Sequence, residues 1–201
     1  MPEYKLCFLN IESLDSENIK TGFEAMSDER KKESLALVTE NKKLQKIAAD
    51  MLCRQMIAEA DGVDPSGIII KKDKNGKPYA ENSRYKFSIS HCGNLVVCAV
   101  SKNDIGVDVE KIRNVRLKMA EKFACESEIE YIGDKLERFF EIWTLKEAYF
   151  KCKGTGLGAD IKSVSFDVTD SNVICSENGY NLFFENVADG CICSVCICES
   201  H

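Results

Sequence analysis

The residues between 136 and 151 have the apolar periodicity of a buried helix, with one carboxylate on the same face. A carboxylate among buried apolar side chains costs free energy unless it is paired or bound to a cation. The pattern therefore predicts a core helix at about 136–151 whose carboxylate meets a cation. The positions that share this face follow steps of four and three: Leu136, Phe140, Trp143, Glu147 and Phe150.

The first half of the chain carries strand and helix patterns in turn. A short helix with Ser27 as its N-cap is followed by a longer helix that Gly62 ends. Asn75 and Gly76 indicate a turn, and three apolar runs after it predict a meander of strands. In chain order we expect a strand at 4–11, helices at 27–38 and 42–60, a strand at 68–70, a turn at 73–78, and strands at 85–90, 95–101 and 105–110.

The second half repeats this order, with helices first and strands after them. No residue-level repeat accompanies it, so the similarity rests on the order of elements. We expect an α+β fold of two similar halves related by pseudo-two-fold symmetry, with residues 1–103 as the N-terminal half and 104–201 as the C-terminal half. The elements expected in the second half are helices at 117–125, 127–132 and 136–151 and strands at 164–166, 181–184 and 191–198.

The composition is that of a globular protein with an ordinary core. The chain has 201 residues, 44% of them hydrophobic, and no run of about 18 apolar residues that would span a membrane. Its first residues lack the basic and apolar regions of a signal peptide. We therefore expect a cytoplasmic protein with no membrane span.

The eleven cysteines are scattered, and most lie within apolar runs. This distribution favours reduced, buried side chains over a disulfide framework. Four of them, together with His201, could serve as zinc ligands, but they alternate with isoleucine as strand residues do, so a zinc site is the less favoured interpretation. The four are Cys191, Cys193, Cys196 and Cys198.

The net charge of −6 argues against nucleic acid as the main partner, because duplex binding needs a basic surface. A phosphorylated small molecule can still bind to local groups of basic residues, although each group alone is better explained as a solvated surface. The groups are Arg30, Lys31 and Lys32; Lys42, Lys43 and Lys46; and Lys71, Lys72, Lys74 and Lys77.

Two carboxylates share one face of the strand expected at 105–110. The strand period of two places Asp108 and Glu110 opposite the apolar residues. Together with Glu147 they would put three negative charges around one pocket, and such an all-oxygen set suits Mg²⁺ better than Zn²⁺. A solvated edge strand explains the spacing equally well.

Two further motifs offer phosphate ligands. His91 lies where the strand at 85–90 ends in a tight turn, and it can bind a phosphate or simply cap that turn. Gly76-Lys77-Pro78 places a lysine in a turn. Each motif alone is a weak signal.

Glu147 and Lys151 stand four residues apart, in the favourable order for a helical ion pair. That pair alone explains their spacing. In a functional interpretation, Lys151 would also stabilise the carboxylate form of Glu147 and compensate charge on a leaving phosphate.

The order of these motifs is more specific than any one of them. It runs from Gly76-Lys77-Pro78 through FSISH at 87–91 and GVDVE at 106–110 to WTLKEAYFK at 143–151. In this order the sequence resembles the 4'-phosphopantetheinyl transferases, of the single-chain, two-half type that acts on carrier proteins of peptide and polyketide synthetases. The resemblance covers about residues 74–153. It implies two similar α+β halves with coenzyme A and Mg²⁺ bound in the cleft between them.

The resemblance also implies roles for individual residues. Mg²⁺ would be held on the pyrophosphate by Asp108, Glu110 and Glu147. The family commonly has Asn, Ser and Arg where this chain has Ser88, Cys92 and Gln45, and Lys46 is expected to substitute for the arginine. The contacts implied for coenzyme A are Lys77, Ser90, His91, Lys146 and Lys151 to the phosphates, Asp108 through the metal, Gly76 and Pro78 at the adenine end, and Arg30 at the 3'-phosphate.

By this resemblance we expect transfer of the phosphopantetheine arm to a serine of an apo acyl or peptidyl carrier protein, with release of adenosine 3',5'-bisphosphate. The pathway served would be peptide, polyketide or fatty acid synthesis. Glu147 would accept the serine proton, while Lys146 and Lys151 stabilise the departing phosphate. Two alternatives are a Mg²⁺-dependent hydrolase of a coenzyme A-like or nucleotide pyrophosphate and a non-catalytic binding module.

We also expect a monomer, because both halves of the implied cleft lie in one chain. Carrier proteins are acidic, as this chain is, so long-range attraction does not explain their docking. We expect an apolar contact near residues 115–123 instead, with Arg113, Arg116 and Lys118 at its rim.

Overall fold

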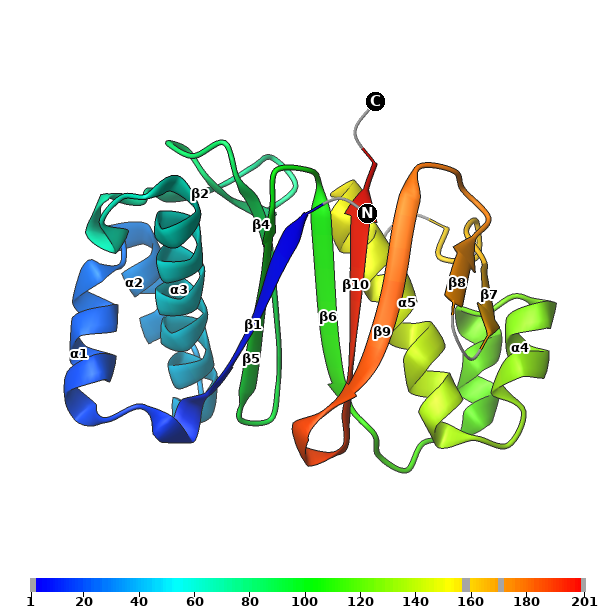
Figure 1. The fold of residues 1–201 in the computed structure, drawn as a ribbon. Coiled ribbons are helices and arrows are strands. Elements are labelled where there is room, and N and C mark those ends of the chain that lie inside the picture. Colours follow the sequence, from blue (N-terminus) through cyan, green and yellow to red (C-terminus); the bar gives the residue numbers. More distant parts are fainter. Residues whose placement is uncertain (1–2, 157–159, 170–171, 200–201) are drawn as a thin grey trace. The chain divides into compact units, whose positions relative to one another are not determined.

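The chain divides into two compact units, one from Glu3 to Lys102 and the other beginning at Asn103. A computed structural model describes residues 3–156, 160–169 and 172–199 (Figure 1). Both units combine helices with antiparallel strands, which confirms the α+β class. Their pseudo-two-fold relation stays a prediction. Within the described residues, no helix is long and apolar enough to cross a membrane.

The N-terminal half places its helices on one side of a small sheet (Figure 1). Its elements are β1 (Tyr4–Asn10), α1 (Ser16–Ala25), α2 (Asp28–Leu35), α3 (Glu40–Asp61), β2 (Ile70–Lys72), β3 (Pro78–Ala80), β4 (Lys86–Cys92) and β5 (Leu95–Ser101), with 3-10 turns at Ile11–Ser13 and Pro65–Gly67. The sheet has the order β1-β5-β4, and β2 and β3 form a separate hairpin. The core lies between α3 and the sheet, where Ile57, Phe87 and Val96 are almost completely buried.

Local signals account for most of these helices. Ser27 caps α2 as expected, and Gly62 ends α3 in the left-handed region at φ +72°. Helix α1 was not predicted, although Ile19 and Phe23 have the four-residue spacing of one helix face. The missed signal is a capping box, in which the backbone N of Asn18 lies 2.7 Å from Oδ1 of Asp15.

The C-terminal half is built around one long helix. Its elements are β6 (Ile105–Lys111), a 3-10 helix at Leu117–Lys122, α4 (Glu126–Ile132), α5 (Leu136–Lys153), β7 (Phe166–Thr169), β8 (Asn172–Cys175), β9 (Tyr180–Val187), a 3-10 turn at Ala188–Gly190 and β10 (Cys191–Cys198). The sheet has the order β6-β10-β9-β8-β7, and α5 packs against β6 and β10. Helix α5 is confirmed, but it is buried on most sides, while Trp143 and Glu147 on the predicted face are only partly buried.

The predicted meander is wrong at its third strand. β6 pairs with β10, with Val107 opposite Val195, and it belongs to a different sheet from β4 and β5. Turn signals before β6 suggested a hairpin, but the partner of β6 lies more than 80 residues later in the chain, beyond the reach of local patterns. β8 was also missed, and the segment predicted as a helix at 117–125 is a 3-10 helix over 117–122. The strands predicted at 68–70 and 164–166 begin at Ile70 and Phe166 instead.

The C-terminal cysteines are residues of strand β10. β10 lies between β6 and β9, and by the strand period Cys191 and Cys193 point to the opposite face from Cys196 and Cys198. No set of three His, Cys, Asp or Glu side chains in the described part of the chain is arranged to hold a metal ion. His201 lies outside the described residues.

Candidate active site

Close packing of α5 on β6 brings the polar residues of the two elements together. A Cβ at Gly106 would lie 1.9 Å from the carbonyl oxygen of Ala148 and 2.4 Å from the nitrogen of Cys152. Those distances are far below van der Waals contact with the α5 backbone, so only glycine fits. Asp108, two residues further along β6, therefore lies beside the last turns of α5.

Asp108 forms a partly buried ion pair with Lys151 of α5. The Nζ of Lys151 lies 2.7 Å from Oδ1 of Asp108 and donates to the carbonyl oxygen of Val107 at 3.1 Å. The Asp108 side chain is only 7% exposed, and that of Lys151 is 31% exposed. Because Asp108 is largely removed from water, the neighbouring cation offsets part of the cost of burying its carboxylate.

The charges of Asp108 and Lys151 also act on the carboxyl group of Glu147. Its pKa is raised to about 7, first by burial and next by the negative charge of Asp108, with a smaller rise from Glu110. The positive charge of Lys151 opposes the rise. Asp108 and Glu110 therefore disfavour the carboxylate form of Glu147, which binds its proton more tightly than an ordinary glutamate and exchanges it near neutral pH.

The carboxylates of Asp108, Glu110 and Glu147 are oxygen donors of the kind that a hard divalent cation prefers, although they do not form a complete coordination site by themselves. Glu110 pairs with Arg113, with 2.8 Å between Oε2 and Nη1, and its side chain is 28% exposed. Among the described residues, no three His, Cys, Asp or Glu side chains lie close enough together to hold a metal ion without other ligands. Oxygen donors suit Mg²⁺, which usually completes its shell with waters and substrate phosphates. A cation here would also relieve the repulsion that raises the pKa of Glu147.

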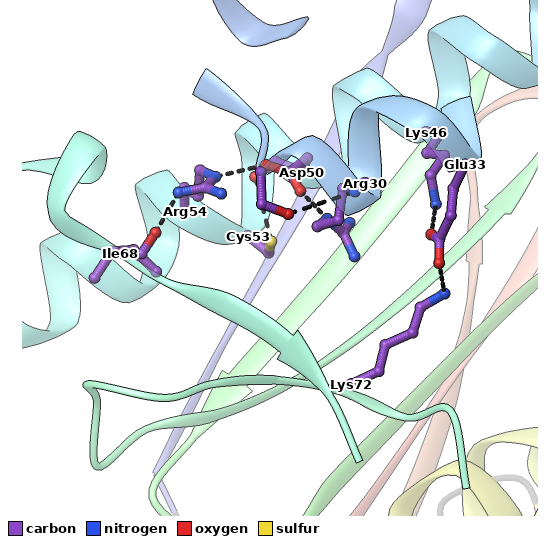
Figure 2. Close-up of polar contacts among 9 residues, drawn as sticks. Arg30, Glu33, Lys46, Asp50, Cys53, Arg54, Ile68 and Lys72 are labelled. Carbon is purple, nitrogen blue, oxygen red and sulfur yellow. Dashed lines mark hydrogen bonds and ion pairs between the residues drawn. The ribbon is translucent and has the colours of Figure 1, made fainter. Parts of the chain in front are cut away.

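In the N-terminal half, Arg30 belongs to a buried charged group (Figure 2). Its Nε donates to Oδ2 of Asp50, which is fully buried, and Nε of Arg54 lies 2.5 Å from Oδ1 of the same residue. Arg54 also donates to the carbonyl oxygen of Ile68. Arg30 is 7% exposed, so its contact with a 3'-phosphate stays a prediction, and a phosphate there would share the guanidinium with Asp50.

A second charged group joins three elements of the same half (Figure 2). Glu33 of α2 accepts from Nζ of Lys46 on α3 at 2.7 Å and from Nζ of Lys72 on β2. Hydrogen bonds from these lysines lower the pKa of Glu33 to about 2. Lys46, expected to replace a family arginine, is therefore paired within the chain. Its neighbour Gln45 donates to the carbonyl oxygen of Gly93 at 2.6 Å.

The other predicted contacts of this half lie on the β2–β3 turn and on β4. Gly76 is exposed, and its φ of +85° explains why a glycine occupies that turn. Lys77 and Pro78 follow it and are partly exposed, whereas Ser90 is buried and His91 at the end of β4 is exposed. Their contacts with a ligand stay predictions.

Two family models match successive parts of the chain. The model described as the N-terminal part of 4'-phosphopantetheinyl transferase matches residues 15–103. The model described as the 4'-phosphopantetheinyl transferase superfamily matches residues 104–196. The chain belongs to this superfamily.

Curated relatives of this transferase carry the same description. The 4'-phosphopantetheinyl transferase gsp of Aneurinibacillus migulanus is 28% identical over 180 residues, which cover 85% of this chain and 76% of that protein. A 4'-phosphopantetheinyl transferase of Bacillus subtilis is 33% identical over 137 residues, or 65% of this chain and 61% of that protein. The transferase Sfp of Bacillus subtilis strain 168 is 28% identical over 152 residues, or 68% of each chain. None of these matches favours a hydrolase.

Lys146, expected to contact a phosphate, is paired with groups of the protein instead. Lys146 is completely buried, its Nζ lies 2.9 Å from Oε2 of Glu128, and it donates to the carbonyl oxygen of Val164. Neighbouring residues of an α-helix point about 100° apart, so the side chains of Lys146 and Glu147 leave α5 in different directions. Lys146 therefore links α5 to Glu128 and Val164 of its own half, and its contact with a phosphate stays a prediction.

The sequence also did not predict three acidic residues that form ion pairs inside the transferase, namely Glu128, Asp50 and Glu33. Glu128 accepts from the backbone N of Cys125 at 2.8 Å, as the third residue of a capping box does, and this spacing was a usable signal. Asp50 and Arg54 have the i, i+4 spacing of a helical pair, which was another. For Glu33 no local signal existed, because its lysine partners are 13 and 39 residues away.

Proposed function

We propose that this transferase moves the 4'-phosphopantetheine arm of coenzyme A to a serine of an apo carrier protein, with Mg²⁺ as its cofactor. The observation that supports this best is the convergence of Asp108, Glu147 and Lys151 at the contact between β6 and α5. This contact lies within the part of the chain matched by the superfamily model. Both the charges and the titrating carboxylate suit transfer of a phosphoryl group.

In the proposed reaction, the serine oxygen forms a bond to the phosphorus that carries the pantetheine arm. The bond from that phosphorus to the bridging oxygen of the pyrophosphate breaks, and adenosine 3',5'-bisphosphate leaves. The serine proton passes to the carboxylate of Glu147, directly or through a water molecule. In the metal-free protein the pKa of Glu147 is raised to about 7, and a bound cation would lower this pKa and keep the side chain in the carboxylate form that accepts a proton.

Positive charge is the second requirement of this chemistry. Asp108, Glu110 and Glu147 would hold Mg²⁺, which supplies charge compensation to the pyrophosphate when bound. Lys151 holds the carboxylate of Asp108 in position by its hydrogen bond. Its ammonium would also offset charge that develops on the leaving phosphate.

An apolar cavity of about 320 Å³ in the C-terminal half supports the carrier contact expected near residues 115–123. Val115, Met119 and Phe123 line it, and Met119 is 47% exposed. Glu110 and Arg113 also line this cavity, so it adjoins one of the three acidic residues. We propose that an apolar side chain of the carrier enters this cavity while basic residues at its rim contact the acidic carrier surface.

The proposal includes a monomer acting in the cytoplasm on carriers of peptide, polyketide or fatty acid synthesis. Both family models match within this one chain, which supports a monomer that needs no second copy. Light scattering during size-exclusion chromatography measures the mass of the species that carries activity.

The function is tested by the intact mass of an apo carrier after incubation with the transferase, coenzyme A and Mg²⁺. We expect the carrier to gain one phosphopantetheine, to gain none when EDTA is present, and to gain none when its acceptor serine is alanine. Consumption of coenzyme A without any mass gain on several unrelated carriers would establish the hydrolase alternative instead. Transfer that continues in EDTA would contradict the metal requirement.

A further inference from the structure

Glu33 lies between two lysines that belong to different elements (Figure 2). One carboxylate oxygen accepts from Lys46 on α3 and the other from Lys72 on β2. The side chains of Glu33, Lys46 and Lys72 are 30%, 21% and 38% exposed, so a dissolved ligand can approach the group. Each lysine therefore already shares a negative charge before any ligand binds.

The same helix carries Arg30, the residue proposed to contact the 3'-phosphate of coenzyme A. Residues three apart on a helix are neighbours, so Glu33 and Arg30 present their charges on the same side of α2. Arg30 is itself paired with Asp50. A phosphate that binds beside α2 must compete with Asp50 for Arg30 and with Glu33 for both lysines. The carboxylate of Glu33 also repels the phosphate.

We propose that Glu33 weakens recognition of the 3'-phosphate, so that the transferase uses coenzyme A and 3'-dephospho-coenzyme A with similar efficiency. This inference rests on the proposed function. Glu33 already pairs with Lys46 and Lys72, as a 3'-phosphate would. When the substrate lacks the 3'-phosphate, both lysines therefore keep a negatively charged partner. Glu33 stays ionised throughout the neutral range, because the two lysines lower its pKa to about 2.

The first test compares kcat/KM of the unaltered enzyme for the two forms of coenzyme A, with one apo carrier held at a fixed concentration. We expect the two values to agree within about threefold, a difference of well under 1.4 kcal/mol. A preference for coenzyme A of more than about tenfold overturns the proposal. This comparison needs no variant and so does not depend on the folding of one.

The second test replaces Glu33 by glutamine, which keeps the size of the side chain and removes its negative charge. We expect Glu33→Gln to raise the preference for coenzyme A over the dephospho form about tenfold, because both lysines then become available to the 3'-phosphate. The matched control is Glu81→Gln. Glu81 pairs with Lys71 at 2.6 Å, so this variant changes the net charge equally and releases the neighbouring lysine on β2. An equal effect of both variants, or no effect of Glu33→Gln, overturns the proposal.

A binding measurement separates this inference from the proposed function. Calorimetry compares adenosine 3',5'-bisphosphate with adenosine 5'-phosphate and requires no transfer. We expect similar Kd values with the unaltered protein and tighter binding of the bisphosphate with Glu33→Gln. If neither form of coenzyme A supports transfer, the proposed function fails, while the ratio of the two Kd values still decides the role of Glu33. A bisphosphate that binds the unaltered protein more than about tenfold tighter overturns that role.

Discussion

The Nζ of Lys151 and Oδ1 of Asp108 lie 2.7 Å apart, across the contact between α5 and β6. Their approach depends on Gly106, which lets the helix backbone rest directly on the strand. Glu147 lies one turn before Lys151 and has a pKa raised to about 7. The site therefore combines one ion-paired carboxylate with another that exchanges its proton near neutral pH.

Replacing Glu147 by glutamine should preserve the fold and abolish most of the turnover. Loss of a positioned base and metal ligand is expected to lower kcat by about 10²- to 10⁴-fold. The carrier mass assay measures kcat, and thermal unfolding measures the fold. Glu137→Gln is the control, since it makes the same change at an exposed position in the first turn of the same helix. A Glu147→Gln enzyme with undiminished kcat removes Glu147 from the mechanism.

Binding of Mg²⁺ should release protons at neutral pH. In the metal-free protein the pKa of Glu147 is raised to about 7, so part of the population carries a proton there. A bound cation favours the carboxylate and lowers this pKa, which releases up to about one proton per site. Titration of Mg²⁺ into weakly buffered protein at pH 7 with an indicator dye measures the release. Glu147→Gln should release none, and metal binding without release by the unaltered protein would show that Glu147 is not a ligand.

Replacing Lys146 by methionine should cost stability, because Lys146 pairs with buried Glu128. The change leaves Glu128 buried without its cation, which typically destabilises a fold by about 3–5 kcal/mol. Urea unfolding measures the loss, and the double variant with Glu128→Gln should recover much of it. Lys153→Met is the control, because Lys153 pairs with Glu177 at the surface and should cost about 1 kcal/mol or less. Unchanged stability would contradict a stabilising role of the Lys146–Glu128 pair, and a raised KM for coenzyme A would support the phosphate contact of Lys146.

Glu33 should contribute to acid sensitivity. Its pKa is lowered from 4.5 to about 2 in the folded protein, so its stabilising contribution is present above pH 4.5 and is lost as the pH falls toward 2. Because the Glu33 side chain is 30% exposed, we expect an effect of about 1 kcal/mol or less. The free energy of unfolding is compared at pH 7 and pH 3 for the unaltered protein and Glu33→Gln. The variant should show the smaller loss, and equal losses would mean that the ion pairs add no net stability.

A charge in the apolar cavity should impair carrier docking alone. Met119→Glu introduces a carboxylate that an acidic carrier repels, and we expect its KM for the carrier to rise about tenfold while its KM for coenzyme A stays unchanged. Ile174→Glu is the matched control, because Ile174 is 54% exposed in the same half and does not line the cavity. Equal carrier KM values for Met119→Glu and the unaltered enzyme would place the docking surface elsewhere.

Elements with strong local signals followed from the sequence alone. Helix α3 has helical apolar spacing and a glycine stop, and β10 alternates through its cysteines, so both were predicted nearly to their observed bounds. The pairing of β6 with β10 was not accessible, since the two strands lie more than 80 residues apart and either neighbour satisfies the alternation of β6. The alternation of side chains along a strand is set by neighbouring residues, whereas the pairing of that strand depends on contacts across the whole sheet.

The same division holds for the site. The sequence by itself determined the α+β class, the family through the order of its motifs, and the presence of Asp108, Glu110 and Glu147 as candidate ligands. Only the tertiary structure decided that Lys151 bonds to Asp108, that Lys146 is buried against Glu128, and that Glu33 holds Lys46 and Lys72. The physical reason is that the charge of a residue and the periodicity of a segment can be recognised from neighbouring residues alone. Burial and ion pairing depend instead on which distant side chains the folded core brings within about 3 Å.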